Sequence, residues 1–323
     1  MGAARQTDRQ RDDNRSQVTI GLIGCGRWGL NILRDLLKLR CRVVVVEIDP
    51  TNRTRAAALH PGLVVSSISE VPEVDGIVVA TPATTHAAVV EGVLDRGVPV
   101  FCEKPLTTDP ESALRLVEAG GDRLFVMHVW AYHRGVMRLA EIARNGELGP
   151  VLALRTERKN WTSPRTDTDA IWTLVPHDLS IGLAILGQIP TPRSAVVEVI
   201  ADKAVSLIAV LGDAPFLALD CSTRFAEKRR EVRLHCRDGV AILPNSESPF
   251  IEILRSTPPI DEVPAVERQL LTGDAALFRE LCVFVDYLRG GPRPPTDARE
   301  GLAVVEGVSA LRALAAVEKC PAN

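Results

Sequence analysis

A lysine and a histidine are the residues of this chain best suited to move a proton to or from a carbon-bound oxygen. Lys104 lies in Glu103-Lys104-Pro105, directly after an apolar run, and His177 lies in a helix-like stretch of the second half. Histidine titrates near neutral pH and suits a general acid or base. A lysine ammonium can stabilise a developing alkoxide, or act as the acid–base group if burial lowers its pKa. These two residues are therefore candidates for chemistry at a C–OH group.

A glycine-rich motif, GCGRWG at residues 24–29, follows a short apolar run and precedes a helix-like stretch at 30–39. In such a motif the first glycine permits a tight turn, the second lets backbone N–H groups approach a pyrophosphate, and the third lets helix and strand pack closely. The helix N-terminus adds a favourable partial charge for an anion. Because the motif joins a strand to a helix, it predicts a dinucleotide site that includes Gly24, Gly26, Arg27, Trp28 and Gly29.

A carboxylate at the end of the second strand-like run predicts which dinucleotide binds. Glu47 follows the glycine motif by about 20 residues, where such an acid binds the ribose hydroxyls. The next residue is Ile48, where an arginine could have held a 2′-phosphate. The segment therefore favours NAD over NADP. A solvated acid at a strand end is the alternative that the sequence leaves open.

Strands and helices alternate from residue 18 to about residue 135, which predicts a doubly wound parallel sheet. The pattern then changes to short apolar or alternating runs, which predict a large open, mostly antiparallel sheet. These runs lie at 195–201, 204–211, 216–224, 230–236, 239–243 and 250–254, and helices are expected at 274–289 and 297–318. We expect an α/β protein with a disordered tail at 1–17, a Rossmann domain at 18–124 and an α+β domain at 125–323.

Composition excludes several classes of protein. The net charge of −3 and the pI of about 6.1 give no basic field for nucleic acid or an anionic membrane. No apolar run reaches the roughly 18 residues of a spanning helix, and the N-terminus lacks the apolar segment of a secretory signal. The seven cysteines are scattered without a CxxC pair, so we expect reduced thiols in a cytoplasmic protein and no metal site.

Further motifs make the chain resemble a known family. Thr81-Pro82 with His86, Glu103-Lys104-Pro105, and His177, together with IGCGRWG, resemble the Gfo/Idh/MocA oxidoreductases. The resemblance implies a Rossmann domain followed by an open-sheet domain that binds substrate and joins copies of the chain. It implies NAD or NADP as cofactor, a sugar or cyclitol as substrate, and a homodimer or homotetramer.

The resemblance also implies roles for individual residues. Thr81, Pro82 and His86 would border the nicotinamide end of the cofactor. Glu103 and Lys104 would sit at the crevice above the sheet, with Lys104 contacting both the cofactor and the reacting hydroxyl. His177 matches the catalytic histidine of the family.

The sequence departs from the family pattern at two positions. Thr173 occupies the place of the family's aspartate, and Asp178 follows His177 directly, which leaves open whether Asp178 compensates. Ala131 stands where many members have an arginine, so contacts made by that arginine are not expected here.

The remaining substrate contacts are expected from aromatic and polar residues of the second half. Trp130 and the run Arg158-Lys159-Asn160-Trp161 could hold a sugar or a nucleotide diphosphate, although a solvated strand end is an equal alternative. The four tryptophans (Trp28, Trp130, Trp161 and Trp172) fall in these segments, so we expect them to mark a cleft between the domains.

Three functions follow as hypotheses. The WxLxPHDL pattern around His177 resembles nucleotide-sugar members of the family and favours an oxidoreductase acting on a ring hydroxyl or ketone, with C3 as one candidate, of a nucleotide-linked hexose. A dehydrogenase for free sugars or cyclitols is the alternative within the same class. A non-catalytic NAD-binding regulator is the alternative of another class, because Thr173 replaces the family's aspartate.

Overall fold

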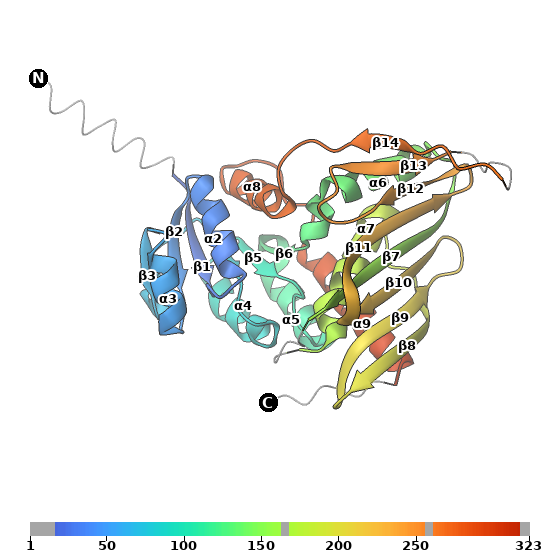
Figure 1. The fold of residues 1–323 in the computed structure, drawn as a ribbon. Coiled ribbons are helices and arrows are strands. Elements are labelled where there is room, and N and C mark those ends of the chain that lie inside the picture. The colour runs from blue at the N-terminus through green and yellow to red at the C-terminus, as the bar shows by residue number, and fades with distance from the viewer. Residues whose placement is uncertain (1–16, 163–167, 256–260, 317–323) are drawn as a thin grey trace, which may run out of the picture.

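The chain folds around two sheets that lie side by side (Figure 1). The computed structural model describes residues 17–162, 168–255 and 261–316. The predicted tail, apart from Gln17, lies outside the described residues. None of the helices in the described ranges has the length and apolar composition needed to cross a bilayer.

The first sheet is parallel throughout and runs in the order β3-β2-β1-β4-β5-β6. Its strands are β1 (Thr19–Ile23), β2 (Arg42–Val46), β3 (Leu63–Val65), β4 (Gly76–Val79), β5 (Val100–Glu103) and β6 (Leu124–Met127). The valines of β2 are buried, as expected of a strand covered on both faces. The predicted Rossmann topology is confirmed, and its strand order places a ligand crevice at the carboxyl ends of β1 and β4. The short edge strand β3 was not predicted, because an apolar run of three residues is too short to indicate a strand by itself.

Helices flank this sheet, and two of them begin at aspartate N-caps. They are α2 (Gly29–Lys38), α3 (Pro50–Ala57), α4 (His86–Leu94) and α5 (Pro110–Gly120). Asp109 caps α5 by accepting a hydrogen bond from the Ser112 N–H, and Pro110 occupies the first helical position, as the sequence predicts.

The second sheet has eight strands in the order β14-β13-β12-β11-β7-β10-β9-β8. They are β7 (Val151–Trp161), β8 (Pro192–Ile200), β9 (Lys203–Leu211), β10 (Phe216–Ser222), β11 (Arg224–Cys236), β12 (Gly239–Leu243), β13 (Phe250–Leu254) and β14 (Glu267–Leu270). Only the β7–β10 pair is parallel among these neighbours, so the predicted mostly antiparallel sheet is confirmed. The polar edge strand β14 was not predicted.

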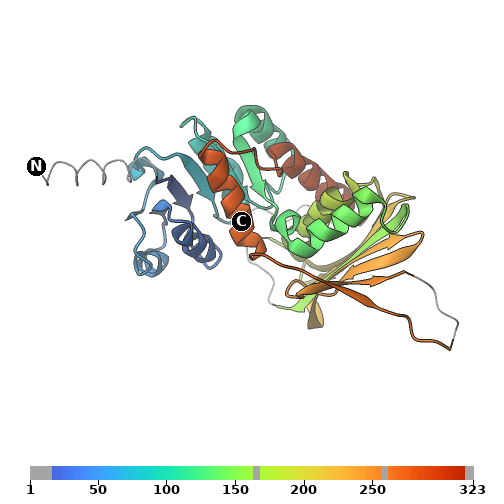
Figure 2. The same cartoon turned by 90° about the horizontal axis from the view of Figure 1, so that it is seen from above.

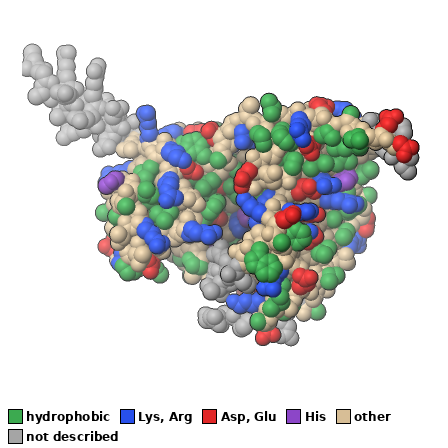
Figure 3. Space-filling view, viewed as in Figure 1, with side chains coloured by type: hydrophobic (Ala, Val, Ile, Leu, Met, Phe, Trp, Pro, Cys, Tyr) green, Lys and Arg blue, Asp and Glu red, His purple; other side chains and the backbone are tan. Residues whose placement is uncertain are grey.

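One face of the second sheet is covered by helices and the other is open (Figure 2). The covering helices are α6 (Arg134–Asn145), α7 (Ala170–Leu186) and α9 (Ala298–Leu314). The open face carries acidic, basic and apolar side chains in close alternation (Figure 3).

The C-terminal helices return to the first sheet. Helix α8 (Ala276–Leu288) buries Leu281, Phe284 and Val285 in the same core as α2, and the Phe284 ring lies 4.9 Å from that of Phe101. Helix α9 packs on α5 and α7. The first sheet also extends past the predicted boundary at residue 124 to Met127. Helix α8, from the C-terminal part of the chain, therefore completes the core of the dinucleotide-binding domain.

Phe284→Ala tests whether α8 helps to form the core of the first sheet. The ring is fully buried, and a buried Phe→Ala change leaves a cavity, so we expect the free energy of unfolding to fall by about 3–5 kcal/mol in urea titrations. Leu114→Ala, at an exposed position on α5, is the control and should change it by about 0.5 kcal/mol or less. Equal effects of the two variants would contradict the packing of α8 described above.

Candidate active site

The glycine loop between β1 and α2 has three glycines with different constraints. Gly24 adopts a φ of +86°, and a Cβ there would lie 2.7 Å from the Ala80 carbonyl oxygen. A Cβ at Gly29 would lie 2.3 Å from the Gly24 carbonyl oxygen, whereas a Cβ at Gly26 would meet nothing within 4 Å. Gly24 and Gly29 are thus required by the fold itself. Gly26 faces open space at the helix N-terminus, which fits the close approach of a pyrophosphate.

Glu47 is buried at the end of β2, and its carboxylate is hydrogen-bonded to this loop. Its carboxylate accepts hydrogen bonds from the backbone N–H of Cys25 at 2.7 Å and of Asp49 at 2.9 Å. Each carboxylate oxygen can accept a second hydrogen bond, so the group keeps capacity for ribose hydroxyls. Ile48 is 83% exposed beside it, and Arg53 donates to the carbonyls of Glu47 and Ile48. Arg27 is exposed.

Trp28 joins the glycine loop to the Glu103-Lys104-Pro105 motif. Its indole N–H donates to the Glu103 carboxylate, whose other oxygen accepts from the Lys104 backbone N–H at 3.1 Å. Trp28 is 44% exposed, so part of the residue stays accessible to solvent. The loop and the motif, which lie on β1 and β5, are therefore neighbours at the same edge of the sheet.

His86 contacts two turns at this edge, one through each ring nitrogen. The ring is buried, with Nδ1 2.8 Å from the Pro105 carbonyl oxygen and Nε2 2.9 Å from that of Thr81. Thr81 also contacts Thr85 through its hydroxyl. The sequence places Thr81, Pro82 and His86 beside the cofactor, and the structure gives His86 a positioning role between the two turns.

Lys104 reaches across to the second domain. Its Nζ donates to the Thr173 carbonyl oxygen at 3.1 Å, in the first turn of α7. The Thr173 hydroxyl donates back to the Asp169 carbonyl at 2.8 Å, so it stabilises the helix start and supplies no carboxylate. His177 lies one turn further along α7.

The environment of His177 keeps its imidazole neutral. Burial, followed by the charge of Lys104, holds the pKa of His177 well below its usual range, with smaller contributions from Arg158, His128 and Arg230. Its Nδ1 has no hydrogen-bond partner among the described residues. A neutral imidazole with an unused nitrogen can accept a proton.

A second histidine lies in the same cluster. His128 follows β6, is buried, and neither ring nitrogen has a partner in the described part of the chain. Burial and then the Lys104 charge lower its pKa to about 3.

Asp178 is held in the core by Arg158 and Cys221. It is fully buried, and one carboxylate oxygen accepts from Arg158 Nε at 3.0 Å and from the Cys221 thiol at 3.2 Å. Arg158 in turn covers the ring of Trp130, 4.4 Å from its centroid. Asp178 therefore pairs with Arg158 and forms no hydrogen bond with His177 or Lys104 in the described ranges.

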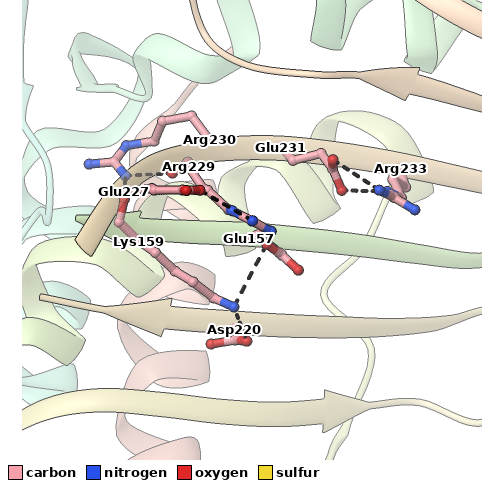
Figure 4. A network of polar contacts seen from close by, with 8 residues as sticks. All are labelled: Glu157, Lys159, Asp220, Glu227, Arg229, Arg230, Glu231 and Arg233. Carbon is pink, nitrogen blue, oxygen red and sulfur yellow. Dashed lines mark hydrogen bonds and ion pairs between the residues drawn. The ribbon is translucent and has the colours of Figure 1, made fainter. Parts of the chain in front are cut away.

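The run Arg158-Lys159-Asn160-Trp161 does not act as one cluster, because successive residues of a strand face opposite sides of the sheet. Lys159 lies on the open face, where it pairs with Asp220 and lies 3.7 Å from Glu157 (Figure 4). Trp161 is 64% exposed under Arg224. Lys159 and Trp161 therefore lie on the opposite face of the sheet from His177, and their expected contact with substrate stays a prediction. Trp130 and Trp172 are both buried in the core, and the expectation that the four tryptophans mark a cleft stays a prediction.

One cation of the cluster was missed from sequence. Arg230 of β11 pairs in register with Arg158 of β7 and donates to the side chain of Asn160. Arg230 lies far from Arg158 in the sequence and is brought beside it by the register of β11 against β7, so no local motif predicts its place. Within the described ranges, no three His, Cys, Asp or Glu side chains group as metal ligands.

Gly26→Ala tests the cofactor loop. The added methyl meets no protein atom, so the free energy of unfolding should stay unchanged, while NAD affinity in calorimetry should fall at least about tenfold because the backbone can no longer approach the pyrophosphate. Gly29→Ala, which forces its Cβ onto the Gly24 carbonyl, should lose both stability and affinity. Unchanged NAD binding by Gly26→Ala would refute the assignment.

Comparison with known sequences agrees with this geometry. Residues 18–128 match the model of an oxidoreductase family with an NAD-binding Rossmann fold. Inositol 2-dehydrogenase 4 of Saccharopolyspora erythraea is 32% identical over 187 residues, covering 53% of this chain and 55% of that protein. An inositol 2-dehydrogenase of Burkholderia lata is 34% identical over 186 residues, with shares of 53% and 55%. The match thus spans about half the length of these curated relatives.

Solved structures extend the likeness of the fold to nearly the whole chain. A UDP-N-acetylglucosamine 3-dehydrogenase from Acidithiobacillus ferrooxidans superposes with a TM-score of 0.80 at 24% identity, covering 93% of this chain and 99% of that one. A levoglucosan dehydrogenase in complex with NADH and levoglucosan gives a TM-score of 0.81 at 16% identity, with shares of 93% and 98%. Residues 18–128 are thus similar to the NAD-binding domain of the Gfo/Idh/MocA oxidoreductases, and the fold of nearly the whole chain is similar to that of these two dehydrogenases.

Proposed function

We propose that this protein is an NAD-dependent dehydrogenase that acts on a ring hydroxyl or ketone, with C3 as one candidate, of a nucleotide-linked hexose. One observation carries the proposal: Lys104 bridges to Thr173 at the edge where the glycine loop lies, and its charge acts on both His177 and His128. A cation and a neutral base thus meet beside the dinucleotide loop.

The chain's own residues would perform the proton chemistry. Bound NAD supplies the nicotinamide ring that exchanges the hydride. The Lys104 ammonium stabilises negative charge on the substrate oxygen as its proton leaves. The His177 imidazole, neutral at the working pH, accepts that proton at a ring nitrogen and returns it in the direction of reduction. Residues 24–29 and Glu47 would hold the cofactor.

The positive charge around His177 favours an anionic substrate. Arg158 and Arg230 lie close enough to affect the pKa of His177, and this positive surrounding suits a substrate with a negatively charged substituent. One structure of similar fold is that of a UDP-N-acetylglucosamine 3-dehydrogenase. The inositol 2-dehydrogenases among the relatives favour the second candidate, a dehydrogenase for free sugars or cyclitols.

We also propose that copies of the chain associate as a homodimer or homotetramer through the open face of the second sheet, where Val196 and Ile208 are exposed. The six described cysteines are free thiols, which supports a reducing compartment such as the cytoplasm.

Lys104→Met and His177→Asn test the proposed chemistry. Each removes one partner of the proton transfer, so we expect turnover to fall about 10²–10⁴-fold while NAD still binds. Lys38→Met, an exposed lysine on α2, is the matched control and should keep full turnover. Full turnover by Lys104→Met would remove the central residue of the mechanism.

The same assay separates the candidate functions when it is run with UDP- and dTDP-hexoses, free hexoses and inositol. Turnover of nucleotide-linked hexoses supports the proposal. Turnover of inositol alone supports the cyclitol alternative, and NAD binding without hydride transfer to any sugar supports a non-catalytic regulator.

A further inference from the structure

A polar cavity adjoins the candidate site but takes no part in the proton chemistry. It has a volume of about 220 Å³ and is lined by Lys228, Arg230, Asn245, Ser246 and Glu247. The two cations come from β11, and the other three residues follow β12. The cavity is several times larger than the roughly 30 Å³ that one water molecule occupies in the liquid, so it has room for a phosphate or diphosphate.

Arg230 gives this cavity a positive charge without a carboxylate partner. Its guanidinium donates to the Lys159 carbonyl at 2.7 Å and to the Asn160 side-chain oxygen at 3.1 Å, and its acceptors in the described ranges are all uncharged. Burial, and then the neighbouring Arg158, lower the pKa of Arg230. The nearby Asp178 is already paired with Arg158. An anion in the cavity would therefore meet a guanidinium that forms no ion pair with a carboxylate in the described ranges, while the charge of Asp178 also acts on it.

The second cation, Lys228, is held only weakly by the protein. Its Nζ lies 2.7 Å from Glu247, and the two side chains are 60% and 78% exposed. Exposed pairs of this kind contribute little to stability, so a bound anion can replace the carboxylate at little cost. In the space-filling view, basic side chains gather near the junction of the two domains (Figure 3).

Side-chain contacts connect the cavity to the reacting centre. The Ser246 carbonyl oxygen lies 3.0 Å from His133 Nε2, and the His133 ring stacks on Trp130 at 5.0 Å. Arg158 lies over the ring of Trp130, and both Arg158 and Arg230 lower the pKa of His177. A substrate that reaches from Lys104 toward this cavity would place one end at the base and the other among the cations.

We propose that this cavity is the subsite for a phosphoryl group of the sugar substrate, with Arg230 as its main anchor, Lys228 as a second cation and Asn245 as an amide donor. The inference rests on the proposed dehydrogenase function and names the residues that would select a phosphorylated or nucleotide-linked sugar. Arginine suits this role because its planar guanidinium can donate two parallel hydrogen bonds to phosphate oxygens. The subsite replaces Lys159 and Trp161, which lie on the open face, as the anchor of the anionic part.

Kinetics with graded substrates test the subsite. Arg230→Met and Lys228→Met are compared with Arg233→Met, which lies on the same strand but pairs with Glu231 on the open face (Figure 4). For a UDP-hexose and a hexose 1-phosphate, we expect KM to rise about 10- to 100-fold in Arg230→Met, with kcat within about threefold. The rise should be much smaller for a neutral hexose and for a hexuronate, and absent in Arg233→Met. An equal rise for neutral and phosphorylated sugars would overturn the subsite.

A binding measurement separates this inference from the proposed function. Isothermal titration of inorganic pyrophosphate into the NAD-saturated protein should show binding to the wild type that weakens at least tenfold in Arg230→Met and stays unchanged in Arg233→Met. Binding with this pattern, but with no sugar oxidised, would support the subsite and refute the dehydrogenase. Sugar oxidation without pyrophosphate binding would refute the subsite alone.

Discussion

The hydrogen bond from Lys104 Nζ to the Thr173 carbonyl oxygen is the contact on which the candidate site depends. It joins the end of β5, in the dinucleotide-binding sheet, to the first turn of α7, in the second domain. Pro176 follows within the helix and has no N–H to donate to the Trp172 carbonyl, so the backbone of this turn is not bound as in a regular helix. An ammonium group held at this turn brings its charge to the helix that carries His177.

Charge and burial then decide the protonation states around this contact. Lys104, Arg158 and Arg230 all act on His177, and burial adds to their effect, so the imidazole stays neutral. Asp178 offsets part of this charge, because it forms a buried ion pair with Arg158 and also acts on Arg230. The positive surroundings favour an alkoxide in the reaction and an anionic substituent in the ground state, and both follow from the same set of cations.

The sequence predicts best the features that are local along the chain. The glycine loop, Glu47 and the Glu103-Lys104-Pro105 motif each lie in one strand and the turn after it, and strand-to-helix alternation is sufficient to locate them. Side-chain direction divides the run on β7, because strand alternation sends Lys159 and Trp161 to the open face while Arg158 and Asn160 face the helices. Arg230 could not be found, because its place beside Arg158 depends on the register of β11 against β7. The return of α8 to the first core likewise depends on tertiary packing that no local pattern shows.

Titration of His177 by NMR, with histidine labelled by ¹⁵N, tests the central claim most directly. In the wild type, we expect the His177 ring to stay neutral at pH 6.5, because its pKa lies well below the usual value. Lys104→Met removes one of the cations that disfavour the imidazolium, so the pKa of His177 should rise toward its usual value. A His177 pKa near 6.5 in the wild type, unchanged in Lys104→Met, would contradict the coupling between the two residues on which the proposed chemistry rests.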